Sequence, residues 1–184
     1  MLVVVGGHSR HVGKTAVITG LMGALPEAAW TAVKVSPHGH GSSAGGAEVI
    51  EQSVADETDT GRFLAAGARR SFLVSARSPD LLAPALGPIL AAAANAVVET
   101  NTALEFLHPD LYLLVINPAV GEVKAAALRY LGRVTACLVH QTEPVECWRE
   151  LLAGPLADKP RFPVCPPHYV SPELVAFVRS RCGF

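Results

Sequence analysis

Residues 2–15 read LVVVGGHSRHVGKT, and this stretch decides the fold of the chain. Four apolar residues lead into a Gly-Gly pair, a short polar loop follows, and Gly13-Lys14-Thr15 closes the stretch. Apolar residues spaced three or four apart then predict a helix from Ala16 to Leu25. A strand, a glycine-bearing loop, Gly-Lys-Thr and a helix in this order are the context that a phosphate-binding loop requires.

This arrangement favours an anion in front of the predicted helix. Backbone N–H groups and the helix dipole both attract negative charge at a helix N-terminus. Lys14 adds a full charge near the terminal phosphates of a nucleotide, and the Thr15 hydroxyl is a ligand for Mg²⁺. We therefore expect ATP or GTP with Mg²⁺ at this loop. The predicted nucleotide-binding residues are Gly7, His8, Ser9, Arg10, His11, Val12, Gly13, Lys14, Thr15 and Ala16.

The loop departs from the usual G-x-x-x-x-G-K-[ST] pattern at one position. The first glycine of the pattern falls on His8, and Gly7 lies one residue earlier, so the loop reads G-x5-G-K-T. The alternative is an ordinary turn between a strand and a helix that carries an exposed lysine. That alternative requires the strand, the glycines, the lysine and the helix to coincide by chance.

Length and composition limit the class of protein. The chain has 184 residues, half of them hydrophobic and 17% charged, with a net charge of −1. This length suits one nucleotide-binding domain over residues 1–184. The charge gives no case for nucleic acid. The longest apolar run, residues 81–98, is broken by Pro84 and Pro88, and the N-terminus lacks a signal-peptide core, so we expect no membrane span and a cytoplasmic location.

Four cysteines are scattered without a C-x-x-C pair, as is typical of cytosolic thiols. They are Cys137, Cys147, Cys165 and Cys182.

Predicted strands and helices alternate along the chain, and the strands are uniformly apolar. This pattern predicts a three-layer α/β fold, a mostly parallel sheet of about seven strands flanked by helices. After the first strand, the predicted strands are 29–35, 70–76, 96–99, 111–116, 134–140 and 161–164. The later predicted helices are 62–66, capped by Thr58 or Thr60, and 79–94, 123–131, 144–152 and 172–181.

Three polar residues fall where such a fold builds its nucleotide site, at the carboxyl ends of strands. Lys34 ends the second predicted strand, Asp59 precedes a predicted helix, and Glu99 ends an apolar strand in the manner of a Walker B acid. With Lys14, these are the predicted catalytic residues, and Thr15, Asp59 and Glu99 are the predicted metal ligands. The alternatives are a solvated lysine at 34, a helix N-cap at 59, with Asp56 and Glu57 as competitors, and a surface acid at 99.

Four histidines lie near these elements. His8, His11, His38 and His40 form a metal cluster if the glycine- and serine-rich loop after residue 35 folds over the phosphate-binding loop, although their spacing matches no recognised zinc pattern. Alternatively, they hydrogen-bond phosphate, substrate or backbone. A second small-molecule substrate is expected near His38 and His40.

With these residues in hand, the chain resembles the SIMIBI group of P-loop NTPases, and within it the MobB family of molybdopterin-guanine dinucleotide biosynthesis proteins. Lys34 with His38-Gly39-His40 occupies the place of that family's Lys-His stretch. Asp59 to Arg62, Ala66-Gly67-Ala68 and Val98-Glu99 match its later motifs. The loop itself is similar to that of dethiobiotin synthetase, which also has G-x5-G-K-T. The resemblance covers about the first two thirds of the chain.

The resemblance implies an NTPase or a phosphoryl-transfer protein, accessory to molybdenum cofactor biosynthesis, with a partner protein and a homodimer as further implications. The sequence also departs from these families. Thr100 follows Glu99 where the family has glycine, and the carrier-side residues of dethiobiotin synthetase are not evident. Residues 140–143 do not give the Asn-Lys-x-Asp of guanine-specific families, so a preference for GTP has no support in the sequence. An ATP-dependent small-molecule kinase or ligase, a nucleotide-binding adaptor with little turnover and a degenerate loop are the competing hypotheses. Arg161 to Pro167 is the expected lining of the base pocket.

Overall fold

The computed structural model of the chain describes residues 1–36 and 46–182, and the side chains up to residue 181. The strands are β1 (Leu2–Gly7), β2 (Thr31–Ser36), β3 (Glu48–Gln52), β4 (Arg70–Ser75), β5 (Ala96–Glu99), β6 (Leu111–Ile116), β7 (Ala136–His140) and β8 (Arg161–Val164). The α-helices are α1 (Lys14–Ala24), α2 (Asp59–Ala65), α3 (Pro79–Ala91), α4 (Ala125–Arg129), α5 (Glu146–Ala153) and α6 (Pro172–Cys182). Short 3-10 helices are η1 (Pro26–Ala28), η2 (Thr102–Glu105) and η3 (Leu131–Arg133).

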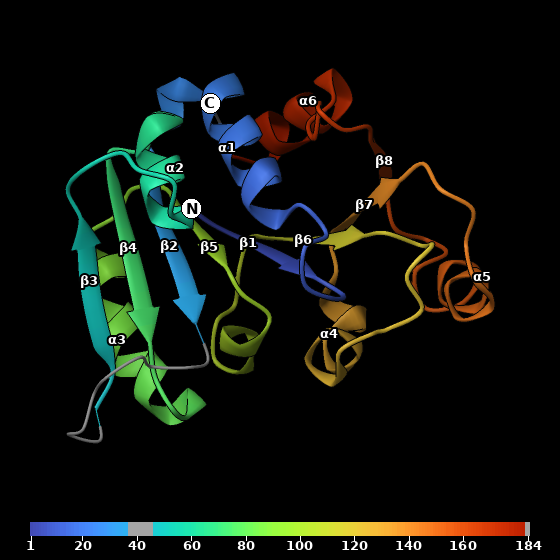
Figure 1. Cartoon of the computed structure of the whole chain (residues 1–184), viewed down its shortest axis with the longest axis horizontal. Helices are drawn as coiled ribbons and strands as arrows, with labels where there is room; N and C mark the ends of the chain where they lie inside the picture. Colours follow the sequence, from blue (N-terminus) through green and yellow to red (C-terminus); the bar gives the residue numbers. More distant parts are fainter. Residues whose placement is uncertain (37–45, 183–184) are drawn as a thin grey trace.

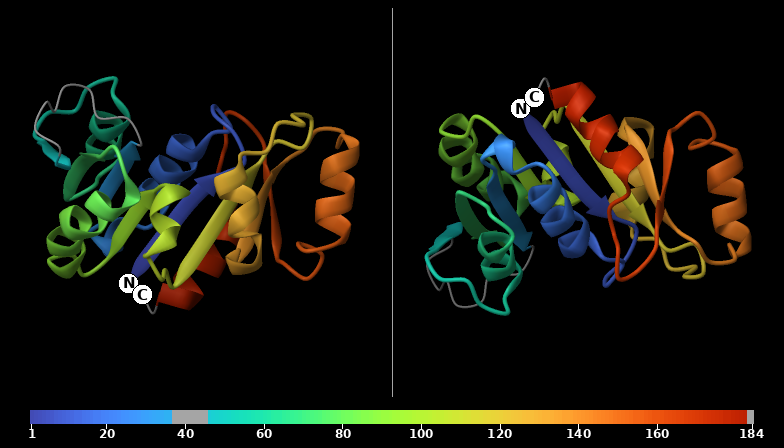
Figure 2. Two further views of the ribbon diagram at one scale, coloured as in Figure 1. Left: turned by 90° about the horizontal axis from the view of Figure 1, so that it is seen from below. Right: turned by 90° about the horizontal axis from the view of Figure 1, so that it is seen from above.

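One sheet runs through the described part of the chain, in the order β3-β4-β2-β5-β1-β6-β7-β8. Every neighbouring pair is parallel except β3 and β4, which are antiparallel. Helices α1, α2 and α6 lie above the sheet in Figure 1, and α3 and α4 lie below it. Figure 2 shows the two faces separately, with α3 and α4 over one and α1 and α6 over the other. The predicted three-layer α/β fold is therefore confirmed.

Because helices cover both faces, the strands at the middle of the sheet are mostly apolar and buried. All six residues of β6 are buried, as are the three valines of β1. One core cluster joins the upper side of the sheet to α1, α2 and α6, through residues such as Ile18, Phe63 and Val178. A second joins the lower side to α3 and α5, through residues such as Leu86 and Trp148. Two-sided burial explains why the strands show no alternation of polar and apolar residues.

The structure adds one strand to the seven that the sequence predicts. Strand β3 falls in the acidic segment 48–59, for which no strand is predicted. It occupies the edge of the sheet, where Val49 and Ile50 are exposed and Glu51 pairs with Arg70 of β4. An edge strand buries little surface, so its sequence carries a weak hydrophobic signal.

One of the two predicted caps of the helix α2 is observed in the structure. Thr58 caps α2 by accepting a hydrogen bond from the Gly61 N–H at 3.0 Å, which decides between the two predicted caps.

Helix α3 contains Pro84 and Pro88, both exposed and one turn apart. No helix in residues 1–36 and 46–182 has both the length and the apolar character needed to cross a bilayer.

Candidate functional site

The register of the parallel strands brings the first two candidate residues together. Lys34 of β2 lies directly opposite Glu99 of β5 in the ladder, so the two side chains project from neighbouring positions. The Lys34 ammonium donates a hydrogen bond to Glu99 Oε1 and also lies 2.9 Å from Asp59 Oδ2 at the start of α2. Lys34 therefore bridges two carboxylates that are 40 residues apart in sequence.

The loop before α1 and the first turn of α1 supply the other half of this cluster. Thr15, in the first turn of α1, donates a hydrogen bond from its hydroxyl to Glu99 Oε2 at 2.9 Å. The Lys14 ammonium lies 3.9 Å from Glu99 Oε1 and 3.4 Å from the Ser9 carbonyl oxygen, to which it donates. Glu99 is only 2% exposed, so this carboxylate is the buried centre on which Lys14, Thr15 and Lys34 converge.

The pKa values of these groups follow from burial and from their neighbours. Burial lowers the pKa of Lys14, and the charges of Lys34 and Lys124 lower it further, against the opposing effect of Glu99. Burial acts in the same direction on Lys34, but Glu99 and Asp59 together raise the pKa of Lys34. Burial alone would raise the pKa of Asp59, whereas the hydrogen bond and charge of Lys34 lower it. Lys34 and Asp59 are thus held in their charged forms at neutral pH.

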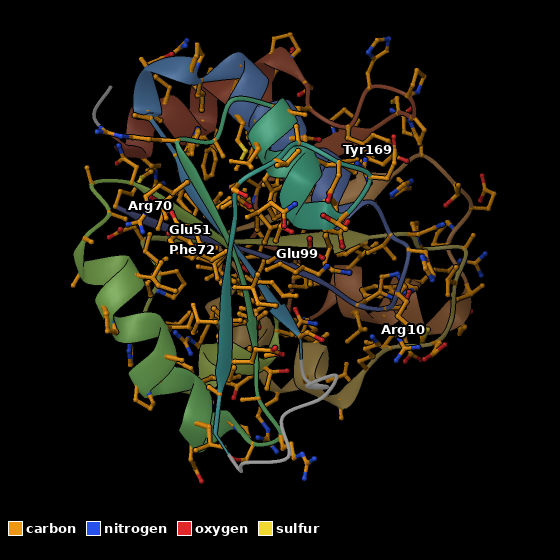
Figure 3. All side chains as sticks on the ribbon, turned by 60° about the vertical axis from the view of Figure 1, so that its left-hand side comes forward. Arg10, Glu51, Arg70, Phe72, Glu99 and Tyr169 are labelled. Atoms are coloured by element: carbon orange, nitrogen blue, oxygen red, sulfur yellow. The ribbon has the colours of Figure 1, made fainter. Side chains whose placement is uncertain are left out.

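A cavity of about 450 Å³ opens in front of this cluster, and we call it the first cavity. It lies at the carboxyl end of the parallel strands, where open α/β sheets bind ligands. Figure 3 shows Glu99 near the centre of the molecule, with Tyr169 and Arg10 to one side of it. The first cavity is lined by Arg10, His11, Gly13, Lys14, Thr15, Ala16, Lys34, Asp59, Arg62, Glu99 and Tyr169.

Two further hollows adjoin the first cavity. A groove of about 650 Å³ runs between α1 and the segment 167–175 and shares Ala16, Arg62 and Tyr169 with the first cavity. A second cavity, of about 340 Å³, shares Arg10, Lys14, Lys34 and Glu99 with the first. The second cavity is lined by Gly7, Ser9, Arg10, Lys14, Lys34, Val35, Ser36, Glu99, Thr100, Asn101, Thr102, Lys124 and Ala126.

The loop before α1 needs glycine at position 13. Gly13 has φ 92°, in the left-handed region, and it is the N-cap residue of α1 without a side-chain cap. A Cβ atom at Gly13 would overlap the ring of Tyr169. Because Gly13 offers no side chain to the helix N-terminus, the first N–H groups of α1 face the first cavity without a capping side chain.

His8 has a structural role in this loop. Its side chain is fully buried, with Nε2 accepting a hydrogen bond from the Asn117 N–H at 3.1 Å and Nδ1 lying 2.9 Å from the Glu122 carbonyl oxygen. These partners require the proton on Nδ1, and burial lowers the pKa of the ring. The ring also packs edge-on against Trp148, with centroids 4.8 Å apart. His8 joins the start of the loop to the segment after β6.

Two other side chains hold the loop in place, and neither is among the predicted site residues. Asn101 accepts a hydrogen bond from the Gly7 N–H at 3.1 Å and donates one to the Gly7 carbonyl oxygen at 2.6 Å. His140 Nε2 lies 2.9 Å from the Val12 carbonyl oxygen. Both residues follow or end strands at the carboxyl edge of the sheet, and that placement is the sequence signal that could have identified them.

The predicted nucleotide-binding residues therefore divide into three groups. Arg10, His11, Gly13 and the start of α1 line the first cavity, and Gly7 and Ser9 line the second. His8 and Val12 are buried among protein groups. His38 and His40 lie outside the described residues, so a second substrate near them stays a prediction. Tyr169 and Lys124 are cavity residues that no sequence motif predicts, and Arg62, which is part of the motif Asp59 to Arg62, also lines the first cavity.

The donor atoms in the first cavity suit Mg²⁺. Thr15 offers a hydroxyl, and Asp59 and Glu99 offer carboxylates, which are the oxygen ligands that Mg²⁺ prefers. Among the described residues, no group of three or more His, Cys, Asp or Glu side chains could hold a metal alone. Mg²⁺ usually binds through one or two carboxylates and substrate phosphates, so two carboxylates beside a phosphate-binding loop fit it.

Comparison with known proteins defines the class of fold. No family model matches the chain, and no curated protein matches it. Among solved structures, the chain is similar to LpxK from Aquifex aeolicus, described as the "apo" form in complex with ATP, with a TM-score of 0.54 and 17% identity. The match covers 88% of this chain and 53% of LpxK, so the chain spans about half the length of LpxK. The chain therefore shares with LpxK a three-layer α/β fold with a mostly parallel sheet.

Proposed function

We propose that this chain binds a nucleoside triphosphate with Mg²⁺ and promotes cleavage of its terminal phosphate bond. One observation carries the proposal. Lys14, Thr15, Lys34, Asp59 and Glu99 come from two strands and two helices and converge on one cavity of about 450 Å³ in front of α1. Two lysines, a hydroxyl and two carboxylates beside a helix N-terminus are the groups needed to bind phosphates and Mg²⁺ together.

Each residue has a role that follows from its position. Lys14 and the N–H groups at the start of α1 bind the phosphates, and Lys34 stabilises the charge that develops on the terminal phosphoryl group. Thr15, Asp59 and Glu99 hold Mg²⁺, which supplies charge neutralisation at the phosphate oxygens. The groove beside Tyr169 accommodates the nucleoside. The groove is lined by Pro167 and the residues that follow it, so it overlaps the predicted stretch Arg161 to Pro167 at Pro167 alone.

The reaction breaks the bond between the terminal phosphorus and the bridging oxygen of the nucleotide. The bond's electron pair stays with the nucleoside diphosphate. A new bond forms from that phosphorus to an oxygen of water, in hydrolysis, or of a second substrate, in transfer. The proton of the attacking water or hydroxyl passes to solvent.

Finer assignments are also proposals. ATP is favoured over GTP, because LpxK is described in complex with ATP and the Asn-Lys-x-Asp motif is missing at residues 140–143. The resemblance to the MobB family supports an accessory role in molybdenum cofactor biosynthesis, with a partner protein, a homodimer and slow turnover. The dethiobiotin synthetase-like loop supports the alternative of an ATP-dependent small-molecule kinase or ligase.

A nucleotide panel tests the proposal. Affinities for ATP, GTP and CTP are measured by calorimetry with and without Mg²⁺, and phosphate release is then followed at saturating nucleotide. We expect ATP to bind more tightly with Mg²⁺ than without it. Lys159→Ala, which removes a cation that lines neither cavity nor the groove, is the matched control and should bind as wild type does. Failure of all three nucleotides to bind would leave a degenerate loop as the explanation.

A further inference from the structure

The second cavity carries an excess of positive charge. Four cationic side chains line it, and Glu99 is its one acidic lining residue in the described part of the chain. The charges of Lys14 and Lys34 are offset by Glu99, and the charge of Lys34 is also offset by Asp59. Arg10 and Lys124 have no ion-pair partner among the described residues. The cavity is therefore lined by two cations whose charges no carboxylate there offsets.

Lys124 is fixed at this place by the backbone. Its N–H donates to the His8 carbonyl oxygen at 2.8 Å, and it directly precedes α4, so the main chain at 124 is tied to the start of the phosphate-binding loop. The ammonium of Lys124 is close enough to lower the pKa of Lys14. Its side chain is half-buried, so an anion beside it would be partly shielded from water and bound more strongly than at the surface.

The rest of the lining suits a small polar molecule. Thr100 and Thr102 line the second cavity with hydroxyl-bearing side chains, and Asn101 lies between them. About 340 Å³ is at the lower end of the volumes of small-molecule sites. Because Lys14, Lys34 and Glu99 line both cavities, a molecule in the second cavity would share these side chains with the phosphates bound in the first.

We propose that the second cavity binds an anionic small molecule, bearing a phosphate or a carboxylate group, and that Lys124 pairs with this anion. This inference rests on the proposed function, because the anion is then the second substrate at the same active site. The site proposed here is not the one expected near His38 and His40. It is formed by residues that the structure describes.

The test uses the full chain saturated with Mg²⁺ and a non-hydrolysable ATP analogue, so that the first cavity is filled. Inorganic phosphate and malonate are titrated separately, and binding is followed by NMR shifts of the backbone amides of Asn101, Thr102 and Lys124. We expect saturable shifts with at least one of the two anions. The stronger binder then identifies the anionic group that the cavity prefers.

Variants assign the anion to Lys124. Lys124→Gln should weaken anion binding by about tenfold, and Lys124→Arg should retain most of it. Arg129→Gln is the matched control, because Arg129 is an exposed cation at the end of α4, the helix that Lys124 precedes, and does not line the second cavity. Binding of the ATP analogue should be unchanged in Arg129→Gln, and in Lys124→Gln it should change less than binding of the anion does.

Two results would overturn the inference. They are the absence of saturable shifts with both anions and equal anion affinity in wild type and Lys124→Gln. If the analogue binds and the anions do not, the proposed function stands and this inference fails. If the analogue itself does not bind, the proposed function fails, and the effect of Lys124→Gln on anion binding to the nucleotide-free protein decides the inference separately.

Discussion

Glu99→Gln tests whether the buried carboxylate is the electrostatic centre of the site. The substitution keeps the size of the side chain and removes its charge, while Lys34 keeps its contact with Asp59 at 2.9 Å. Lys14 loses its nearest carboxylate, which is 3.9 Å away. Two unit charges at this distance attract by about 1 kcal/mol in bulk water and about 4 kcal/mol at an effective dielectric constant of 20. Lys14 is one-fifth exposed, so we expect an intermediate value, a loss of about 2 kcal/mol.

The assay is urea unfolding of the nucleotide-free protein at pH 7, and Asp59→Asn is the comparison. Asp59 also pairs with Lys34, but its side chain is 38% exposed against 2% for Glu99. Water screens an exposed pair, so Asp59→Asn should lower the free energy of unfolding by less than about 1 kcal/mol. Equal losses in the two variants, or a stabilised Glu99→Gln protein, would refute the reasoning.

Two further predictions concern the loop. Gly13→Ala should lower the free energy of unfolding by about 1–2 kcal/mol from its left-handed backbone, and by more because of the Tyr169 ring. In a Tyr169→Ala background the loss measured in urea should be smaller but still present. Burial lowers the pKa of His8 below 6.5, so unfolded chains take up a proton first, and stability should fall as pH drops below about 6.5. His8→Asn should flatten this dependence in unfolding curves collected from pH 7 to pH 5.

The sequence predicts the structure best where adjacent residues form a pattern that folds in one known way. The order of apolar strand, glycine-bearing loop, Gly-Lys-Thr and helix predicted β1, the loop and α1 correctly, because these parts are adjacent in the chain. The uniformly apolar strands predicted the parallel sheet, because strands buried on both faces show no alternation of polar and apolar residues. Strand β3 was not predicted because it lies at an edge, where Val49 and Ile50 remain exposed.

The contacts between distant segments could not be worked out from sequence patterns alone. Lys34 and Glu99 were predicted individually, but their contact depends on β2 and β5 being neighbours, which the order of strands along the chain does not state. Tyr169 and Lys124 reach the cavities from segments that carry no motif, whereas Arg62 belongs to the motif Asp59 to Arg62, which alone does not state that its side chain lines a cavity. His8 looked like a nucleotide-binding residue because of its place in the loop, and only its buried contacts with Asn117 and Glu122 reveal its structural role.

The central claim is that the loop at residues 7–15 binds the phosphates of a nucleotide through Lys14. Its most direct test is calorimetric titration of ATP with Mg²⁺ into the wild-type protein and into Lys14→Ala, with folding of both confirmed by their unfolding curves. The account predicts that wild type binds and that the variant binds at least about tenfold more weakly, because a charge-assisted contact is lost. Equal affinities in two folded proteins, or no binding to wild type, would contradict it.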